Sequence, residues 1–287
     1  MLTAELVPDL LSVLTASFNY RRYIEDTLQS VQALGGRVQH VVVDDESTDG
    51  SREYLRSWDS QITYLEQQNA GLAEALNTAL ERASGEWVGW LNADDFYLPW
   101  VSEALDSITD ERVDVLYGDT VFVDASGRFL RLAPQHPYSL SVLRRYGPYI
   151  YPPSFFVRRA MLGARAWNTS TVKLMDLDLY LTLAARKARF LYIAKPLGVM
   201  RRHPLQESYK PTPKDETLAL QRRHGLPTDP RLARMARWRG GVQHAALKLG
   251  SGGYIRQFRS RSMVGASMMW WNDPSGSSNV DRLARVY

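Results

Sequence analysis

Predicted strands and helices alternate along the first hundred residues of the chain. Continuous runs of apolar and β-branched residues, typical of strands buried on both faces, predict strands at 11–18, 38–45, 62–67 and 86–95. Apolar residues at helical spacing, with turn-forming clusters or a closing glycine at their ends, predict helices at 20–34, 52–58 and 71–85. Strict alternation predicts βαβ crossovers and a mainly parallel, twisted central sheet flanked by helices, which is an α/β fold.

The second part of the chain loses this regularity. The segment 114–132 predicts two strands around an Asp-Ala-Ser-Gly turn, and 152–162 predicts a strand that runs into a helix. A further helix is expected at 171–188. The segment 209–216 has two prolines and mixed charge, so it is the best candidate for a linker.

Polar residues stand at the ends of three of the predicted strands. The first strand ends in Thr15, Ser17 and Asn19, the second in Asp44 and Asp45, and the fourth in Asn92, Asp94 and Asp95. Ligands of parallel α/β sheets bind beyond the carboxyl ends of the strands. We therefore expect these side chains to meet at one edge of the sheet.

Two adjacent carboxylates, Asp94 and Asp95, close a strongly apolar strand. Like charges side by side at a buried strand end are costly unless something positive lies between them. Carboxylates are the ligands that Mg²⁺ and Mn²⁺ prefer, and substrate phosphates commonly complete the coordination shell. An isolated Asp-Asp pair is more often a turn or a helix cap, but the second acidic pair, Asp44 and Asp45, favours ligand binding here.

Composition excludes several classes of chemistry. The chain has 287 residues, 45% of them apolar, and no cysteine, so disulfides, cysteine zinc sites and thiolate catalysis are excluded. No run approaches the roughly 18 uninterrupted apolar residues of a membrane-spanning helix. Glu5 and Asp9 stand where a signal peptide carries positive charge. We expect a soluble, cytoplasmic protein without a cleaved leader.

Charge is unevenly distributed along the chain. Residues 213–287 hold 13 Lys and Arg against 5 Asp and Glu, a balance of +8, whereas residues 1–212 carry a balance of −4. The basic part contains arginines next to Trp and Met, a composition that favours an anionic membrane surface or a lipid diphosphate. The alternative is a helical extension that packs on the acidic part, or a dimer arm.

Known nucleotide-binding loops are absent from the sequence. No G-x-G-x-x-G follows the first strand and no G-x-x-x-x-G-K occurs, which disfavours a dinucleotide enzyme and a P-loop phosphotransferase. No nucleic-acid-binding module is visible either, so we expect no nucleic-acid partner.

Six stretches together resemble the successive signatures of family 2 glycosyltransferases. They are LTASFNYRRYIEDTLQSV, VVVDDESTDGS, QNAGLAEALN, ASGEWVGWLNADDFYLP, DVLYGD and MDLDLYLTLA, in the order and approximate spacing of that family, from about residue 10 to about residue 205. The resemblance implies the GT-A nucleotide-diphosphosugar transferase fold. It implies a catalytic domain at 1–208, with a nucleotide-sugar half at about 1–112 and an acceptor half at about 113–208, followed by a helical basic extension at 209–287.

The resemblance also implies which residues bind the donor. Thr15, Ser17 and Asp45 fall where the family holds the nucleotide base and ribose. Asn77, which closes QNAGLAEALN, and Asp94 fall among the other donor contacts, Asp94 at the ribose or behind the metal.

The resemblance also implies which residues are the metal ligands and the catalytic base. Asp95 matches the direct ligand of Mn²⁺ or Mg²⁺, and His203 stands where related sequences carry a histidine that approaches the metal or diphosphate. Asp176 matches the catalytic base of inverting members. Without the resemblance, Asp176 and Asp178 read equally well as surface charges of a helix, although Leu174, Leu177 and Leu181 bury that helix, and His203 reads as an exposed loop histidine.

Three positions depart from the family pattern. Glu46 stands where relatives commonly have Gly, Asn69 where many have Asp, and Thr182 where many have Arg. These changes leave the metal pair and the base in place and bear on the identity of the donor.

The expected function is therefore a metal-dependent, inverting transfer of a sugar from a nucleotide-diphosphosugar, with UDP-sugars favoured, to a glycan or lipid-linked acceptor, in cell-surface polysaccharide synthesis. A homodimer and peripheral contact of 213–287 with the inner face of the membrane are further expectations. The alternatives are a non-catalytic nucleotide- or glycan-binding subunit, and a sugar-phosphate nucleotidyltransferase, which would need a glycine-rich phosphate loop that SFNYRRY lacks.

Overall fold

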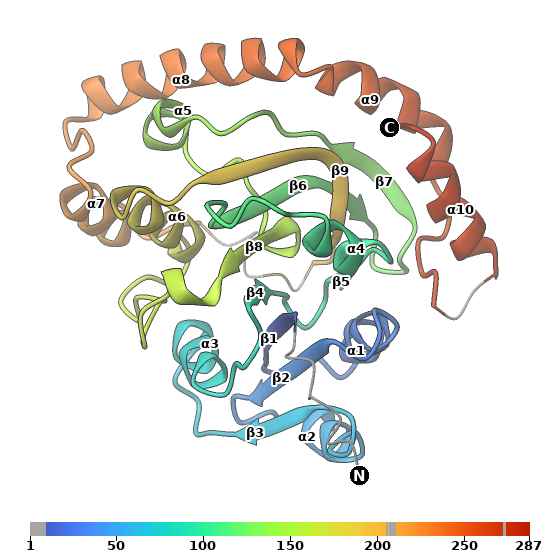
Figure 1. Cartoon of the computed structure of the whole chain (residues 1–287). Coiled ribbons are helices and arrows are strands. Elements are labelled where there is room, and N and C mark those ends of the chain that lie inside the picture. The colour runs from blue at the N-terminus through green and yellow to red at the C-terminus, as the bar shows by residue number, and fades with distance from the viewer. Residues whose placement is uncertain (1–9, 205, 207–210, 272–273) are drawn as a thin grey trace.

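One mixed sheet runs through the centre of the molecule, with helices on both of its sides (Figure 1). The computed structural model describes residues 10–204, 206, 211–271 and 274–287. The strands are β1 (Leu11–Ser17), β2 (Val38–Asp44), β3 (Thr63–Glu66), β4 (Trp87–Trp90), β5 (Phe96–Tyr97), β6 (Val115–Val123), β7 (Phe129–Ala133), β8 (Phe155–Arg158) and β9 (Phe190–Arg201). The helices are α1 (Ile24–Gln32), α2 (Ser51–Arg56), α3 (Leu72–Leu80), α4 (Val101–Asp106), α5 (Leu140–Arg145), α6 (Met175–Ala185), α7 (Lys214–Arg223), α8 (Pro230–Gly250), α9 (Gly253–Arg259) and α10 (Pro274–Ala284).

The strand order is β3-β2-β1-β4-β8-β6-β9-β5, and β7, outside this order, pairs with β6. Strands β1 to β4 pair with one another in parallel, which confirms the prediction for the first hundred residues. Strand β8 inserts antiparallel between β4 and β6, so the sheet as a whole is mixed. The predicted halves 1–112 and 113–208 thus share one sheet.

The valine run of β2 explains why this strand lies in the middle of a layered structure. Val41 and Val43 pack in the cluster that contains the buried side of α3, whereas Val42 packs with residues of α1 and α2 on the other face. All three valines are fully buried. A strand covered by helices on both faces needs apolar side chains at every position, and each buried valine stabilises the fold by about 1.5 kcal/mol or more.

Four elements differ from their predicted lengths. Strand β4 ends at Trp90 because the backbone turns at 92–95, where the Asp95 N–H donates to the Asn92 carbonyl. Helix α3 ends at Leu80, and the backbone N–H of Gly85, which the prediction placed at the end of this helix, donates to the Ser12 hydroxyl at 2.8 Å. The segment 152–162 holds only β8 and two short 3₁₀ turns rather than a strand and a helix. Helix α6 begins at Met175, after a loop whose backbone N–H groups donate to Glu216 of α7.

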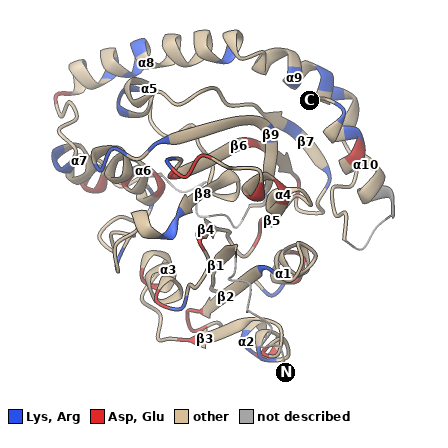
Figure 2. Cartoon of the chain, viewed as in Figure 1, with Lys and Arg blue, Asp and Glu red and all other residues tan. Residues whose placement is uncertain are grey.

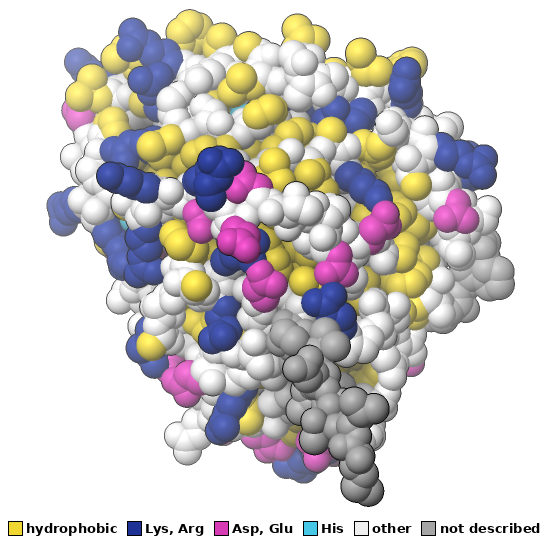
Figure 3. Space-filling view, viewed as in Figure 1, with side chains coloured by type: hydrophobic (Ala, Val, Ile, Leu, Met, Phe, Trp, Pro, Cys, Tyr) yellow, Lys and Arg dark blue, Asp and Glu magenta, His cyan; other side chains and the backbone are white. Residues whose placement is uncertain are grey.

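The C-terminal extension wraps around the rest of the chain. In Figure 1, α8 and α9 form an arc over α5 and the far end of the sheet, and α10 follows at the side. Basic residues band α8 and α9 (Figure 2), and apolar side chains stand along the same rim (Figure 3). Met263, Met268, Val280 and Leu283 lie in the same buried cluster as the strands β4 to β6. The extension therefore packs against the sheet of the preceding part of the chain.

Parts of two predictions lie outside the described residues. The absence of a leader concerns 1–9, and the linker 209–216 includes 209 and 210. No helix among the described ranges is both long enough and apolar enough to cross a bilayer.

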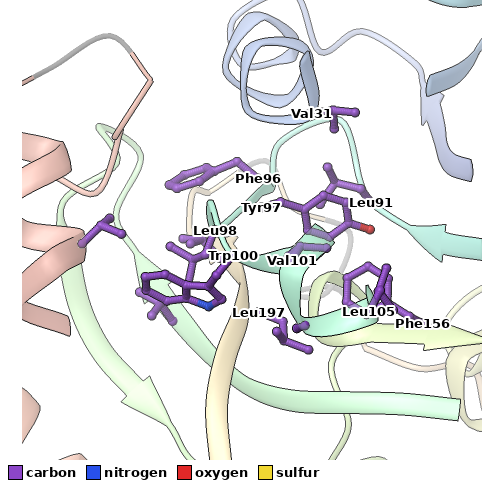
Figure 4. Packing of buried hydrophobic residues seen from close by; sticks show 14 of the residues in the cluster. Val31, Leu91, Phe96, Tyr97, Leu98, Trp100, Val101, Leu105, Phe156 and Leu197 are labelled. Carbon is purple, nitrogen blue, oxygen red and sulfur yellow. The ribbon is translucent and has the colours of Figure 1, made fainter. Parts of the chain in front are cut away.

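A dense apolar cluster supports the turn that carries the two aspartates. Phe96, Tyr97, Leu98 and Trp100 follow that turn directly and are buried against residues of α1, α4 and β9 (Figure 4). The Trp100 indole N–H donates to the Pro196 carbonyl at 2.6 Å. Close packing of this kind fixes the backbone from which Asp94 and Asp95 project.

Candidate active site

The parallel register brings the strand-end residues to one edge of the sheet, as predicted. Ser17 is the register partner of Asp44 on the neighbouring strand. Leu14 pairs with Trp90, so the turn at 92–95 follows β4 at the level where β1 ends. The carboxyl ends of β1, β2 and β4 thus present their polar residues together.

Two buried oxygens at this edge have no hydrogen-bond partner among the described residues. They are the hydroxyl of Ser17 and one carboxylate oxygen of Asp44. The other oxygen of Asp44 accepts the Ser47 N–H at 2.9 Å. An unpaired buried polar group is costly, so two of them on adjacent strands indicate a place that a polar ligand completes. Thr15 lies two residues before Ser17 in β1. Its hydroxyl is 3.0 Å from the Nε2 of His40, so it already has a hydrogen-bond partner.

Asp45 organises the loop that leads into α3. Its carboxylate accepts N–H groups from Gln67 at 2.7 Å, Ala70 at 3.0 Å and Gly71 at 2.9 Å. The next residue, Glu46, has a φ of 71°, the left-handed region that glycine occupies without strain. Its carboxylate accepts the Asn69 N–H at 3.2 Å. Two of the three departures from the family pattern therefore contact each other.

Asp94 and Asp95 project in different directions and have different surroundings. Asp94 lies 2.9 Å from the Nε2 of His203 and accepts the side-chain N–H of Gln206 at 3.1 Å. Asp95 is fully buried, and its two oxygens accept the backbone N–H of Arg201 at 2.9 Å and the Asn92 amide at 3.1 Å. Burial, and secondarily the charge of Asp94, raises the pKa of Asp95 well above its usual range.

The positive group near the two carboxylates is Arg201, at the end of β9. Its guanidinium is 1% exposed and donates to the Asp26 carboxylate at 2.6 Å and to the backbone carbonyls of Asp94 and Ala125 at 2.9 Å each. Burial raises the pKa of Asp26, an effect that Arg201 opposes. Sequence reasoning missed this residue, although an arginine closing an apolar twelve-residue strand was a visible signal.

His203 is the second side chain that faces Asp94. Its ring lies 4.5 Å from that of Tyr23, centre to centre, and its Nδ1 is buried without a hydrogen-bond partner in the described chain. Asp94 and His203 thus supply an oxygen and a nitrogen next to each other. No group of three or more His, Asp and Glu side chains converges as a metal site within the described residues. A cation held by this pair would take its other ligands from a substrate, as Mg²⁺ commonly does.

Asp176 lies on the first turn of α6 and is half-buried. One of its oxygens accepts the N–H of Leu177 at 2.6 Å. The N-terminus of a helix favours a carboxylate in its charged form, but burial is the larger effect and raises the pKa of Asp176 to about 6, with a further contribution from Glu216. A carboxylate with a pKa near neutrality is suited to take up a proton.

Helix α7 fixes the start of α6. Glu216 accepts the backbone N–H groups of Val172 at 3.0 Å, Lys173 at 2.7 Å and Leu174 at 2.8 Å. Asp178, on the buried side of α6, lies 2.6 Å from His224. This support for Asp176 was missed in the sequence, because nothing local links residue 216 to residue 172.

The structure brings some of the predicted residues together and keeps others apart. Asp94, Asp95 and His203 form one group, and Thr15, Ser17 and Asp45 end the neighbouring strands. No hydrogen bond or ion pair joins Asp176 to either group in the described parts of the chain. Asn77 is fully buried, and its amide both donates to and accepts from the backbone of Trp167, at 2.8 and 3.0 Å. Its geometry is that of a packing residue, and its donor contact stays a prediction.

Comparison with known proteins gives a family match. The model of "Glycosyl transferase family 2" matches residues 12–172, more than half of the chain. The putative teichuronic acid biosynthesis glycosyltransferase TuaG of Bacillus subtilis is 45% identical over 92 residues, 30% of this chain and 36% of that protein. Glycosyltransferase GlyA of Streptococcus pneumoniae is 32% identical over 130 residues, 43% of this chain and 19% of that protein. The chain thus matches about a third or less of the length of these relatives.

Solved structures share the fold over nearly the whole chain. S. aureus TarS 1–349 in complex with UDP-GlcNAc superposes with a TM-score of 0.61 at 16% identity, covering 97% of this chain and 91% of that one. The mannosyltransferase PcManGT from Pyrobaculum calidifontis, in complex with GDP-Man and Mn²⁺, has a TM-score of 0.54 at 17% identity, covering 97% and 86%. These likenesses show a shared fold, the GT-A fold expected from the sequence.

Proposed function

The chain belongs to glycosyl transferase family 2, and from that premise we propose that it transfers a sugar from a nucleotide-diphosphosugar to a glycan or lipid-linked acceptor with inversion at the anomeric carbon. The observation that carries this proposal is the sheet edge where Asp94 and His203 face each other beside the unpartnered oxygens of Ser17 and Asp44. TuaG acts in teichuronic acid biosynthesis by its name, which supports a role in cell-surface polysaccharide synthesis.

Asp94 and His203, rather than Asp95, are the metal ligands in this proposal. Both oxygens of Asp95 are occupied by Arg201 and Asn92, and the side chain has no exposed surface. Asp95 therefore positions the turn, and Asp94 projects toward His203. A divalent cation, Mn²⁺ or Mg²⁺, would neutralise the diphosphate as it leaves, which is worth several kcal/mol of the barrier.

The nucleoside would occupy the ends of β1 and β2. Ser17 and Asp44 each offer one unsatisfied oxygen to its hydroxyl and N–H groups. Asp45 and Thr15 shape this site from behind, and Asp45 contributes a direct contact only if it releases one of the N–H groups it now accepts. UDP-sugars are the favoured donors, since TarS was crystallised with UDP-GlcNAc, and GDP-sugars are the first alternative.

Asp176 is the proposed base of the single displacement. It accepts the proton of the acceptor hydroxyl as that oxygen attacks the anomeric carbon and the nucleoside diphosphate departs from the opposite side. A positioned base of this kind contributes about 10²- to 10⁴-fold. Glu216 keeps the start of α6 in place through three backbone hydrogen bonds.

A cavity beside α6 supports an amphipathic acceptor. It measures about 410 Å³ and reaches Leu174, the residue before α6, and Leu177, the residue that follows Asp176 in the first turn of α6. Arg144, Arg145 and Arg237 also line it, and none of these three forms an ion pair with a described residue. Apolar walls with guanidinium groups that form no ion pair suit a lipid-linked phosphate or diphosphate. A homodimer stays a prediction.

The experiment that tests this function is a transfer assay with a panel of nucleotide sugars and lipid-linked or oligosaccharide acceptors, with and without Mn²⁺. Nuclear magnetic resonance of the product gives the configuration of the new bond. The proposal expects one donor to be used, a metal requirement and inversion. A retained configuration would refute the single displacement. Nucleotide binding without transfer or donor hydrolysis, unchanged in Asp176→Asn, would instead support a non-catalytic binding subunit.

A further inference from the structure

Helices α8 and α9 expose a row of large apolar side chains. On α8 these are Leu232, Met235, Trp238, Val242 and Leu249, and on α9 and the segment after it they are Tyr254, Ile255, Phe258 and Val264. Each is between 43% and 69% exposed. Single exposed apolar residues are ordinary, but a contiguous row of them marks an interaction surface. We call this row, together with the basic residues beside it, the α8–α9 face.

The α8–α9 face points away from the protein. Gly240 is the buried residue of α8, and a Cβ there would lie 2.7 Å from the backbone nitrogen of Tyr146, so this side of the helix rests on the end of α5. At about 100° per residue, Met235, Trp238, Val242 and Leu249 fall within about 60° of one another and roughly opposite Gly240. A helix on the surface of a soluble protein is normally polar on its outer side. Helix α8 differs, because its outer side carries the apolar row.

The charge on the same segment has one sign. Residues 230–271 contain eight cationic residues and no Asp or Glu; the cations are Arg231, Arg234, Arg237, Arg239, Lys248, Arg256, Arg259 and Arg261. Arg256 is paired with Asp119 at 3.1 Å. The others form no ion pair with a described residue, and Figure 2 shows their bands along the arc. On the helical projection of α8, Arg234 and Arg239 lie on opposite flanks of the apolar row.

The apolar row and the cations together indicate what binds the α8–α9 face. Apolar residues at the centre and cations on the flanks are the arrangement of a helix that lies in the interface of an anionic bilayer. A second copy of the chain fits poorly, because a two-fold contact would set this face against itself. The cations of both copies would then be brought together with no carboxylate from 230–271 to pair them.

We propose that the α8–α9 face binds the surface of an anionic lipid bilayer, with the apolar row in the headgroup region and the arginines against lipid phosphates. The helices lie along the membrane. The cavity proposed for the acceptor borders the same helix, since Ala233, Ala236 and Arg237 line it. An acceptor anchored in that membrane would reach the cavity from beneath α8. This surface does not depend on the transfer reaction, so it can be tested separately.

The test is co-sedimentation of the full chain with vesicles of phosphatidylcholine alone and with one third phosphatidylglycerol, at 50 and 500 mM salt. We expect binding to the anionic vesicles at low salt and weaker binding at high salt. Arg239→Gln should weaken binding about fivefold, whereas Arg82→Gln, an exposed arginine at the end of α3, should leave it unchanged.

Apolar contact is tested by two matched leucine variants. Leu249→Ala should weaken vesicle binding several-fold, and Leu130→Ala, the same change at an exposed position of β7, should not. The triple variant Trp238→Ala, Leu249→Ala, Phe258→Ala should lose binding by tenfold or more. Brominated lipids should quench the tryptophan fluorescence of the wild type, and this quenching should be weaker in Trp238→Phe. All variants should keep the circular dichroism spectrum and nucleotide binding of the wild type.

Three outcomes would overturn the proposal. They are absence of binding to anionic vesicles at 50 mM salt, equal binding by the triple variant and the wild type, and a dimer in solution that Trp238→Ala dissociates without any vesicle binding. The last would assign the α8–α9 face to a second copy. Loss of transfer activity with vesicle binding intact would count against the proposed function alone.

Discussion

Replacing the proposed base, Asp176→Asn, should abolish transfer and make the folded protein more stable at neutral pH. The two effects have one cause, the burial that raises the pKa of this carboxyl from 3.8 to about 6. The asparagine keeps an oxygen that can accept the Leu177 N–H, and it carries no charge to bury. Activity should fall by about 10²- to 10⁴-fold, because the acceptor hydroxyl loses its proton acceptor.

The size of the stability effect follows from the pKa difference. Because the folded carboxyl holds its proton to a higher pH than the unfolded one, the native state loses stability as pH rises from about 4 to about 6. Each pKa unit is worth 1.36 kcal/mol, so the wild type forfeits about 3 kcal/mol at pH 7.5 and about 1 kcal/mol at pH 4.5. Asp176→Asn should recover these amounts.

Urea denaturation at the two pH values measures the change in the free energy of unfolding. Initial rates between pH 4.5 and 8 measure how activity depends on the protonation of Asp176. In the wild type, kcat/KM should be flat above about pH 6 and fall tenfold per unit below it. Asp178→Asn is the control on the same helix, and it should lower stability because it weakens the contact with His224. If Asp176→Asn is less stable than the wild type at pH 7.5, or keeps its activity, Asp176 is not a buried catalytic base.

Three other substitutions test the framework around the site. Arg201→Met should lower the free energy of unfolding by about 3–5 kcal/mol, because it leaves the half-buried Asp26 carboxylate and the carbonyls of Asp94 and Ala125 without their donor. Arg22→Met, at an exposed position, should cost under about 1 kcal/mol, and equal losses for the two variants in urea denaturation would contradict this expectation. Gly198→Ala should prevent folding, since its Cβ would lie 1.9 Å from the Pro153 carbonyl oxygen, whereas Gly36→Ala has open space and should fold; circular dichroism decides. Asp119→Ala removes the acceptor of Arg256 and of the Tyr287 hydroxyl, so amide hydrogen exchange should accelerate in α9 and α10 but stay slow in β1 and β2.

The first half of the fold could be predicted because its signals are local. The valine run at 41–43 has only one arrangement that buries every side chain, a strand with helices on both faces, and the structure has it. The insertion of β8 between β4 and β6 could not be predicted. Strand 155–158 is short, and its partners are set by packing between segments that are far apart in the chain.

The candidate site, like the fold, could be predicted from the sequence only in part. The sequence placed Asp94 and Asp95 at a strand end, but it could not tell which carboxylate turns inward, because that depends on the backbone N–H of Arg201, more than a hundred residues away. The resemblance implies Asp95 as the metal ligand, whereas we propose Asp94, because both oxygens of Asp95 accept hydrogen bonds. Arg201 itself is held by partners from α1, the 92–95 turn and the segment after β6, a combination that only the folded chain assembles.

The most direct test of the central claim is calorimetric titration of UDP, GDP, dTDP and CDP, each with and without Mn²⁺, into the wild type and into Asp94→Ala and His203→Ala. We expect that one nucleotide binds, that its affinity depends on Mn²⁺, and that each substitution removes this dependence. Binding of none of the nucleotides to the folded wild type, or a Mn²⁺ dependence that survives in both variants, would contradict this expectation.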